Sequence, residues 1–209
     1  MPGMRIGLFG GSFDPPHEGH VNLTDMAIRR FQLDRVWWLV TPGNPLKSHG
    51  PAPMSARMEM ARDILKGDPR VEVTDIEARL NTRLTADVVA AIQRRWPAVH
   101  FIWLMGSDNL VQFDRWQRWR DIADRIPIGV IARPGTRLQG RLSRAAQAMS
   151  RYRLPEHLAP RLAVTTPPAW VLINVPMSPL SSSAIRAADG RRMSAPSLAN
   201  GRAPLLTER

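Results

Sequence analysis

The chain has 209 residues, 44% of them hydrophobic, and this length favours one domain with a sizeable core. It contains no cysteine, which excludes disulfide bonds, thiolate metal ligands and a cysteine nucleophile. The formal net charge of +11 indicates an affinity for anions such as nucleotides or nucleic acids, and charge alone does not choose between them.

Short apolar runs alternate with segments of helical spacing along the chain. Six runs are predicted to be strands: residues 5–9, 36–40, 71–73, 100–105, 126–132 and 170–175. They lack a clean apolar–polar alternation, which is typical of strands buried on both faces of a sheet. The pattern predicts an α/β fold with a doubly wound, mostly parallel sheet, in which ligands bind beyond the carboxyl ends of the strands.

Three segments between the strands carry apolar residues at helical spacing. These are Leu23, Ala27 and Phe31, then Met58, Ala61 and Leu65, then Val88, Ala91 and Ile92 behind Thr85 as an N-cap. Residues 137–168 are expected to form a surface excursion with one helical stretch near 139–151. Residues 189–209 are expected to be a flexible tail, because Gly, Pro and Ser are scattered there among basic residues.

No apolar run has the length of a membrane span, and the apolar run near the amino terminus is too short for a signal peptide. We therefore expect a soluble cytoplasmic protein without a membrane partner. The sequence does not indicate the oligomeric state.

The stretch "GGSFDPPHEGH", residues 10–20, follows the first predicted strand. Its glycines would let backbone N–H groups approach an anion and would permit positive φ, and Ser12 would add a hydroxyl donor. A helix is expected to begin near Gly19 or His20 and to present the positive end of its dipole to the loop. His17 and His20, three residues apart, would both face the bound anion.

Two other interpretations of this stretch remain open. It could be a tight turn that carries two surface histidines, because short glycine motifs recur by chance. Asp14, His17 and His20 could also bind a transition metal, although the H-E-x-x-H pattern and a third histidine at comparable spacing are both missing.

"GGSFDPPHEGH" resembles the amino-terminal signature of the nucleotidyltransferase superfamily that carries an H-x-G-H motif. The second signature of that superfamily, I-S-S-T-x-I-R, resembles "LSSSAIR" at residues 180–186. Between them, "TPGNPLK" (41–47), "MGSDNLVQFDRW" (105–116) and "VIARPG" (130–135) resemble the bacterial nicotinate-nucleotide adenylyltransferases. The likeness covers about residues 4–188 and implies a Rossmann-like nucleotidyltransferase domain over 1–188, with 189–209 outside it.

The resemblance implies transfer of the AMP moiety of ATP to nicotinate mononucleotide, giving nicotinate adenine dinucleotide and pyrophosphate in NAD biosynthesis. It implies Mg²⁺ carried by the ATP phosphates, no separate protein metal site and no nucleic-acid partner. Nicotinamide mononucleotide or phosphopantetheine remains an alternative acceptor. A basic nucleic-acid-binding protein with seven tryptophans is the alternative from another class, although Trp37, Trp38 and Trp103 fall inside predicted strands.

By the same resemblance, His17 and His20 are the catalytic residues, with His20 the stabiliser of the transition state. The implied ATP-binding residues are Gly10, Gly11, Ser12, Phe13, Arg133, Ser182, Ser183 and Arg186. The implied mononucleotide-binding residues are Lys47, Thr85, Gly106, Asp108 and Trp116. Some have plain structural alternatives, such as a helix cap for Asp108 and a half-buried core position for Trp116.

The chain departs from the family pattern at four places, one of which is the family's closing amphipathic helix, not recognisable in the sequence after Asp189. Ser183 stands where threonine is commoner, and it keeps the hydroxyl. Leu84 replaces the aromatic residue before Thr85, and Leu46 replaces the histidine before Lys47, with His49 nearby.

Overall fold

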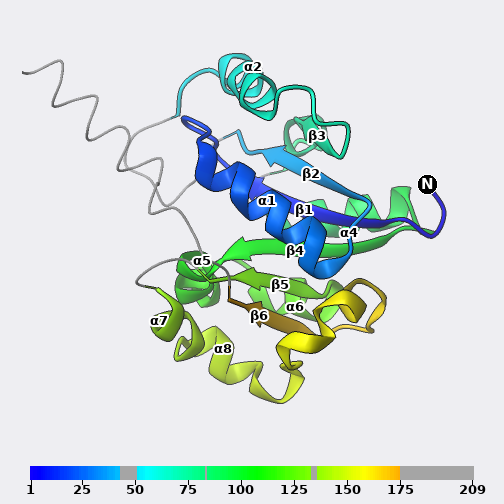
Figure 1. Ribbon diagram of the computed structural model, residues 1–209, viewed down its shortest axis with the longest axis vertical. Coiled ribbons are helices and arrows are strands. Elements are labelled where there is room, and N and C mark those ends of the chain that lie inside the picture. The colour runs from blue at the N-terminus through cyan, green and yellow to red at the C-terminus, as the bar shows by residue number, and fades with distance from the viewer. Residues whose placement is uncertain (43–50, 83, 133–135, 175–209) are drawn as a thin grey trace, which may run out of the picture.

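A computed structural model of the chain describes residues 1–42, 51–82, 84–132 and 136–174 (Figure 1). Within these ranges six parallel strands form one sheet in the order β3-β2-β1-β4-β5-β6. The strands are β1 Arg5–Gly11, β2 Arg35–Val40, β3 Val71–Thr74, β4 His100–Gly106, β5 Ile128–Ile131 and β6 Trp170–Ile173. All six predicted strands and the α/β doubly wound class are confirmed.

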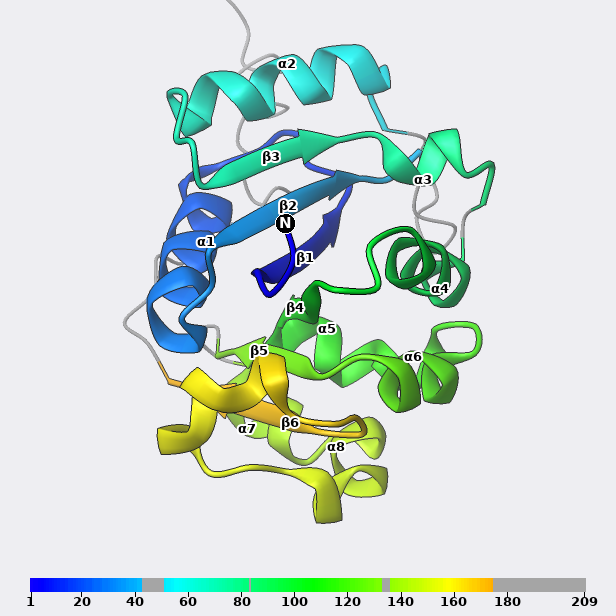
Figure 2. The same cartoon turned by 90° about the vertical axis from the view of Figure 1, so that its right-hand side faces the viewer.

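Helices cover both faces of the sheet. The α-helices are α1 Glu18–Phe31, α2 Met54–Leu65, α3 Ile76–Arg79, α4 Thr85–Arg95, α5 Ser107–Gln112, α6 Trp119–Arg125, α7 Arg137–Arg141 and α8 Arg144–Ala148. The 3₁₀ helices are η1 Phe113–Arg115, η2 Ser150–Tyr152 and η3 Glu156–Val164. Figure 2 shows α1 on one face and α4 and α6 on the other. Within the described ranges, none of the helices has both the length and the apolar character needed to cross a membrane.

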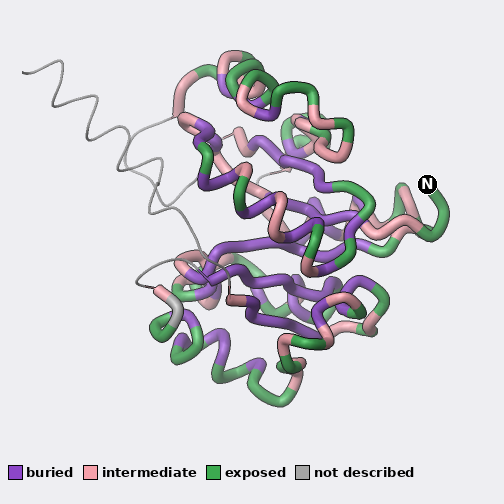
Figure 3. The backbone as a smooth tube through the Cα atoms, viewed as in Figure 1, coloured by how far each residue is buried: buried purple, intermediate pink, exposed green. Residues whose placement is uncertain are grey.

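The core consists of two apolar layers separated by the sheet, and the strands are its most continuously buried part (Figure 3). Successive strand residues point to opposite faces, so Trp37 enters the α4 and α6 layer while Trp38 enters the α1 and α2 layer. Trp37, Trp38 and Trp103 are all buried. Their burial makes them core residues and removes three aromatic rings from any base-stacking surface.

Three local predictions were wrong in detail. Thr85 is the first residue of α4 and the N-cap is Leu84, which offers no side-chain acceptor. Helix α1 begins at Glu18, because His17 caps it. Neither Gly10 nor Gly11 has a positive φ; both belong to β1, and the left-handed residue of this turn is Phe13, with φ 45°.

The excursion between β5 and β6 contains more helix than predicted. It forms α7, α8, η2 and η3, and η3 continues through Pro160. Ala159 and Leu162 of η3 pack into the same apolar layer as α1, so part of this segment belongs to the core instead of the surface.

Candidate active site

The strand order reverses between β1 and β4. The chain leaves β1 for β2 on one side and later returns with β4 on the other side. In open parallel sheets such a reversal opens a ligand-binding crevice at the carboxyl ends of the two strands. Here these ends are Gly11 and Gly106, and the starts of α1 and α5 lie at that edge of the sheet (Figure 1).

Close packing requires a glycine at position 10 and leaves little room for a side chain at Gly11. A Cβ atom on Gly10 would lie 2.8 Å from Cη2 of Trp103, closer than real side chains approach. A Cβ atom on Gly11 would lie 3.2 Å from Cε2 of Phe13. The backbone of β1 therefore runs directly beside two aromatic rings.

His17 and His20 form a reciprocal cap at the start of α1. The Nδ1 atom of His17 accepts a hydrogen bond from the backbone N–H of Gly19 (3.1 Å), and Nδ1 of His20 accepts one from the backbone N–H of His17 (3.2 Å). The ring centroids are 3.9 Å apart, and both residues are buried. The two imidazoles therefore lie together at the helix entrance, and the prediction that both face a bound anion stays a prediction.

The cap determines the tautomer of both imidazoles. A ring nitrogen that accepts a hydrogen bond carries no proton, so the proton of each neutral ring lies on Nε2. Each histidine thus has an Nε2–H donor on the side of the ring opposite the backbone bond. Together with the positive end of the α1 dipole, these two donors suit a bound polyanion.

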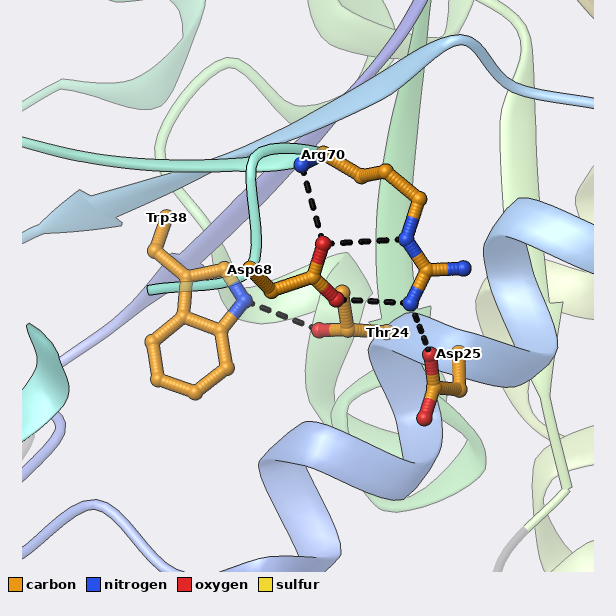
Figure 4. A network of polar contacts seen from close by, with 5 residues as sticks. All are labelled: Thr24, Asp25, Trp38, Asp68 and Arg70. Carbon is orange, nitrogen blue, oxygen red and sulfur yellow. Dashed lines mark hydrogen bonds and ion pairs between the residues drawn. The ribbon is translucent and has the colours of Figure 1, made fainter. Parts of the chain in front are cut away.

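An aromatic cluster holds His20 from the side of β2. The Phe13 ring stacks on Trp38 with a centroid distance of 4.6 Å and an angle of 8°, and it lies 4.9 Å from the His20 ring. Trp38 is fixed in turn, because its Nε1–H donates to Oγ1 of Thr24 on α1 (2.8 Å; Figure 4). The turn, α1 and β2 are therefore joined through these rings and the hydrogen bond from Trp38 to Thr24.

Helix α1 is also tied to the segment that enters β3. The guanidinium of Arg70 donates to Asp68 and to Asp25, the residue after Thr24 (Figure 4). The hydrogen bond from Arg70 holds the pKa of Asp68 below its usual range, with burial acting in the opposite direction. These half-exposed ion pairs orient α1 more than they stabilise it, because solvent screens them.

The β4 side of this reversal point carries residues predicted to bind the mononucleotide. Trp116 is half-buried at the end of η1, 6.2 Å from the Trp103 ring and 5.4 Å from the Phe113 ring, both nearly edge-on. Trp103 contacts Gly10, so Trp116 is linked through it to the end of β1. Gly106 ends β4, and Asp108 lies in the first turn of α5.

Trp116 is therefore neither an isolated surface side chain nor a fully buried one. The N-cap residue of α5 is Gly106, so the interpretation of Asp108 as a helix cap is wrong.

Thr85 lies at the start of α4, whose buried side chains belong to the same apolar layer as Trp103.

Several predicted site residues lie outside the described residues. They are Lys47, Arg133, Ser182, Ser183 and Arg186, together with Leu46, His49 and the tail 189–209. The expected meeting of the amino-terminal turn with the serine-rich segment therefore stays a prediction.

Sequence reasoning missed Arg57, a buried arginine on α2 that hydrogen-bonds to the carbonyl of Ser12. The sequence does contain a sign that Arg57 faces inward, which is its spacing of four residues from Ala61 and of eight from Leu65. These three are the buried residues of α2. The predicted apolar face of this helix includes Met58 instead, and Met58 is only partly buried.

The part of the chain that the structure describes contains no group of three or more His, Asp or Glu side chains able to hold a metal ion. His17 and His20 also use Nδ1 for the helix cap, so only Nε2 could reach a metal.

Comparison with known proteins identifies the family. The cytidylyltransferase-like family model matches residues 8–188. A relative from Ruegeria pomeroyi, named "Probable nicotinate-nucleotide adenylyltransferase", is 58% identical over 189 residues, which cover 90% of this chain and 88% of the relative. A relative of the same name from Roseobacter denitrificans is 55% identical over 188 residues, which cover 90% of this chain and 94% of that protein.

Solved structures share the fold. Nicotinic acid mononucleotide adenylyltransferase from Plasmodium falciparum, complexed with NaAD, has a TM-score of 0.69 at 19% identity over 88% of this chain and 83% of that chain. The same protein complexed with APC has a TM-score of 0.67 at 18% identity, with the same coverage. At this identity the likeness supports the Rossmann-like fold alone. By its sequence matches, the chain belongs to the cytidylyltransferase-like family and, within it, to the nicotinate-nucleotide adenylyltransferases.

Proposed function

We propose that the chain transfers the AMP moiety of ATP to nicotinate mononucleotide. A phosphate oxygen of the mononucleotide forms a bond to the α-phosphorus of ATP, and the bond from that phosphorus to the bridging oxygen of the β-phosphate breaks. The products are nicotinate adenine dinucleotide and pyrophosphate. Relatives that are more than half identical and carry this name support the assignment.

The observation that carries the mechanism is the reciprocal cap of His17 and His20. Pyrophosphate gains negative charge as it leaves, and a site that stabilises this charge with donors already in place accelerates the reaction. The two Nε2–H groups and the start of α1 supply such donors. Because backbone bonds fix both rings before substrate arrives, little reorganisation is needed during the reaction.

The mechanism needs no general base. The attacking phosphate monoester has a second pKa of about 6, so near neutral pH it is already an anion. The enzyme must instead hold two polyanions in line for attack, which positioned donors and cations can do.

The described residues fit a magnesium ion that arrives bound to ATP better than a resident one, since none of their acidic or histidine side chains form a three-ligand cluster. Mg²⁺ bound in this way neutralises part of the triphosphate charge. Asp108, in the first turn of α5 just after β4, is the carboxylate of the predicted site and would lie between the two nucleotides.

The remaining roles follow the family pattern. Gly10, Gly11, Ser12 and Phe13 would bind ATP through the backbone. Ser182, Ser183 and Arg186 would hold its phosphates, and Arg133 would also bind ATP. Trp116 would stack on the pyridine ring, Thr85 would bind its carboxylate, and Gly106 and Lys47 would complete the acceptor pocket.

The test is product formation by the purified full-length chain with ATP, Mg²⁺ and nicotinate mononucleotide, followed by mass spectrometry. The proposal expects the nicotinate dinucleotide and an equal amount of pyrophosphate. Nicotinamide mononucleotide in a parallel reaction tests the acceptor. Equal turnover of the two acceptors would contradict the nicotinate assignment, and no dinucleotide from either would contradict the activity itself.

A further inference from the structure

Arg57 is an arginine in an unusual place. It lies in the first half of α2, and only 1% of its surface is exposed. Its guanidinium donates to three backbone carbonyls: Nη1 to Ser12 (2.5 Å) and Thr41 (3.0 Å), and Nε to Ala52 (2.7 Å). None of these is an ion pair, so the side chain acts mainly on the backbone.

The three carbonyls belong to separate segments at the carboxyl edge of the sheet. Ser12 lies in the turn that follows β1, Thr41 directly follows β2, and Ala52 precedes α2. The turn and the end of β2 are also joined directly, because the backbone N–H of Thr41 donates to the carbonyl of Gly11 (3.0 Å). Thr41 and Ala52 lie on either side of residues 43–50, which include Lys47.

We propose that Arg57 is a positioning residue for ATP, which acts by orienting the Ser12–Phe13 peptide toward the triphosphate. This inference rests on the proposed function, in which the backbone of Ser12 and Phe13 lines the nucleotide. Arg57 does not itself touch substrate in this account.

The peptide geometry explains how the orientation works. The C=O and N–H groups of a trans peptide point in opposite directions. Arg57 draws the Ser12 carbonyl toward α2, so the N–H of Phe13 points away from α2. The positive φ of Phe13 is a conformation that non-glycine residues adopt at a cost, and the hydrogen bond to Ser12 helps to hold the chain there.

The charge of Arg57 also strengthens this donor. A cation bound to a carbonyl polarises the whole peptide unit and makes its N–H a better donor. The effect is larger where water is excluded, and Arg57 is almost fully buried. Burial lowers the pKa of the guanidinium, and nearby Asp14 partly offsets this.

Packing alone does not account for an arginine here. A methionine has a similar length and fills a buried space without the desolvation cost of a charge. What methionine cannot provide is a planar set of donors that reaches three carbonyls at once. The positioning role follows from this difference.

The test compares steady-state kinetics of Arg57→Met and Arg57→Lys with wild type, with ATP and nicotinate mononucleotide varied separately. Arg57→Met removes the donors and the charge, whereas Arg57→Lys keeps the charge and removes the planar fork. Arg62, exposed on the same helix, provides the matched controls Arg62→Met and Arg62→Lys. Thermal melting and circular dichroism identify a temperature at which every variant is folded.

The proposal expects Arg57→Met to raise KM for ATP at least about tenfold, the loss typical of one hydrogen bond to a charged group. Arg57→Lys should recover part of this loss, and both Arg62 variants should stay within about twofold of wild type. If Arg57→Met does not fold, the KM for ATP of Arg57→Lys tests the proposal instead. We then expect this KM to rise about threefold or more.

Two results would overturn the role of Arg57. One is an unchanged KM for ATP in a folded Arg57→Met whose melting temperature is lowered. If only Arg57→Lys folds, an unchanged KM for ATP in that variant has the same meaning. The other is an effect confined to KM for the mononucleotide. Wild type that forms no dinucleotide would instead disprove the proposed function, so the two failures are distinguishable.

Discussion

The Nδ1 atom of His20 accepts a hydrogen bond from the backbone N–H of His17 over 3.2 Å. This bond links the two residues of the motif in a defined tautomeric state, because the ring nitrogen that caps the helix cannot also carry the proton. The same residue thus stabilises α1 through Nδ1 and, in the proposed mechanism, would offer a donor to substrate through Nε2.

The two nitrogens of His20 can be tested separately. Asparagine places a polar atom where Nδ1 lies, whereas glutamine reaches the position of Nε2. We expect His20→Asn to keep the melting temperature within a few degrees of wild type and to lower kcat by about 10²–10³, the cost of one lost transition-state donor. His20→Gln should retain more activity than His20→Asn, whereas His20→Ala should lose both the donor and the cap.

Steady-state rates and thermal melts of His20→Asn, His20→Gln and His20→Ala check this separation. Full activity in His20→Asn would remove the Nε2–H group from the mechanism.

Trp116 should contribute to acceptor binding alone. Its ring is half-buried against Trp103 and Phe113, near the end of β4. Trp116→Ala should raise KM for nicotinate mononucleotide by about 5- to 150-fold, since stacking on a base is worth about 1–3 kcal/mol. KM for ATP should change little. If ATP binding weakened and acceptor binding did not, Trp116 would belong to a different pocket.

Gly10 should not tolerate even one methyl group. A Cβ atom there would lie 2.8 Å from Cη2 and 3.0 Å from Cζ2 of the buried Trp103 ring. We expect Gly10→Ala to cost about 1–3 kcal/mol of folding free energy through overpacking. Denaturant unfolding of Gly10→Ala, with and without Trp103→Phe, measures it. The smaller ring should recover part of the loss, and purely additive effects would argue against this contact.

Glu77 makes stability depend on pH. It is 5% exposed on α3, and burial raises its pKa from 4.5 to about 7. Between these values the folded protein holds a proton that the unfolded chain releases, so unfolding free energy falls as pH rises through this window. The total loss is about 3 kcal/mol, from about 1.4 kcal/mol for each pKa unit.

Replacing Glu77 with glutamine should remove this loss. Glu77→Gln is expected to stabilise the protein by up to about 3 kcal/mol at pH 8 and to have little effect at pH 4. Glu72→Gln, at an exposed position of β3, is the control and should stay within about 0.5 kcal/mol at both values. Denaturant titrations at pH 4, 6 and 8 give the comparison, and identical pH profiles for wild type and Glu77→Gln would contradict the burial of a protonated Glu77.

The strands could be predicted because burial on both faces of a parallel sheet produces short, continuous apolar runs such as residues 36–40 and 100–105. The pairing of His17 with His20 could be predicted too, because residues three apart at a helix start share a face. The two motifs, at residues 10–20 and 180–186, are specific enough together to indicate the family from the sequence alone.

Other features depend on tertiary contacts that no local pattern encodes. Histidine is not a favoured N-cap, so the reciprocal bonds of His17 and His20 are invisible to propensity. A lone arginine on a helix is normally exposed, and only the spacing to Ala61 and Leu65 indicates that Arg57 faces inward. The requirement for Gly10 likewise comes from Trp103, far along the chain, and not from its own backbone angle.

The account depends most on the place where the triphosphate binds. The most direct measurement is a crystal structure of the full chain with a non-hydrolysable ATP analogue and Mg²⁺. We expect phosphate oxygens within about 3.2 Å of Nε2 of both His17 and His20, with Ser182, Ser183 and Arg186 on the same triphosphate. A triphosphate bound away from the start of α1 would contradict the account.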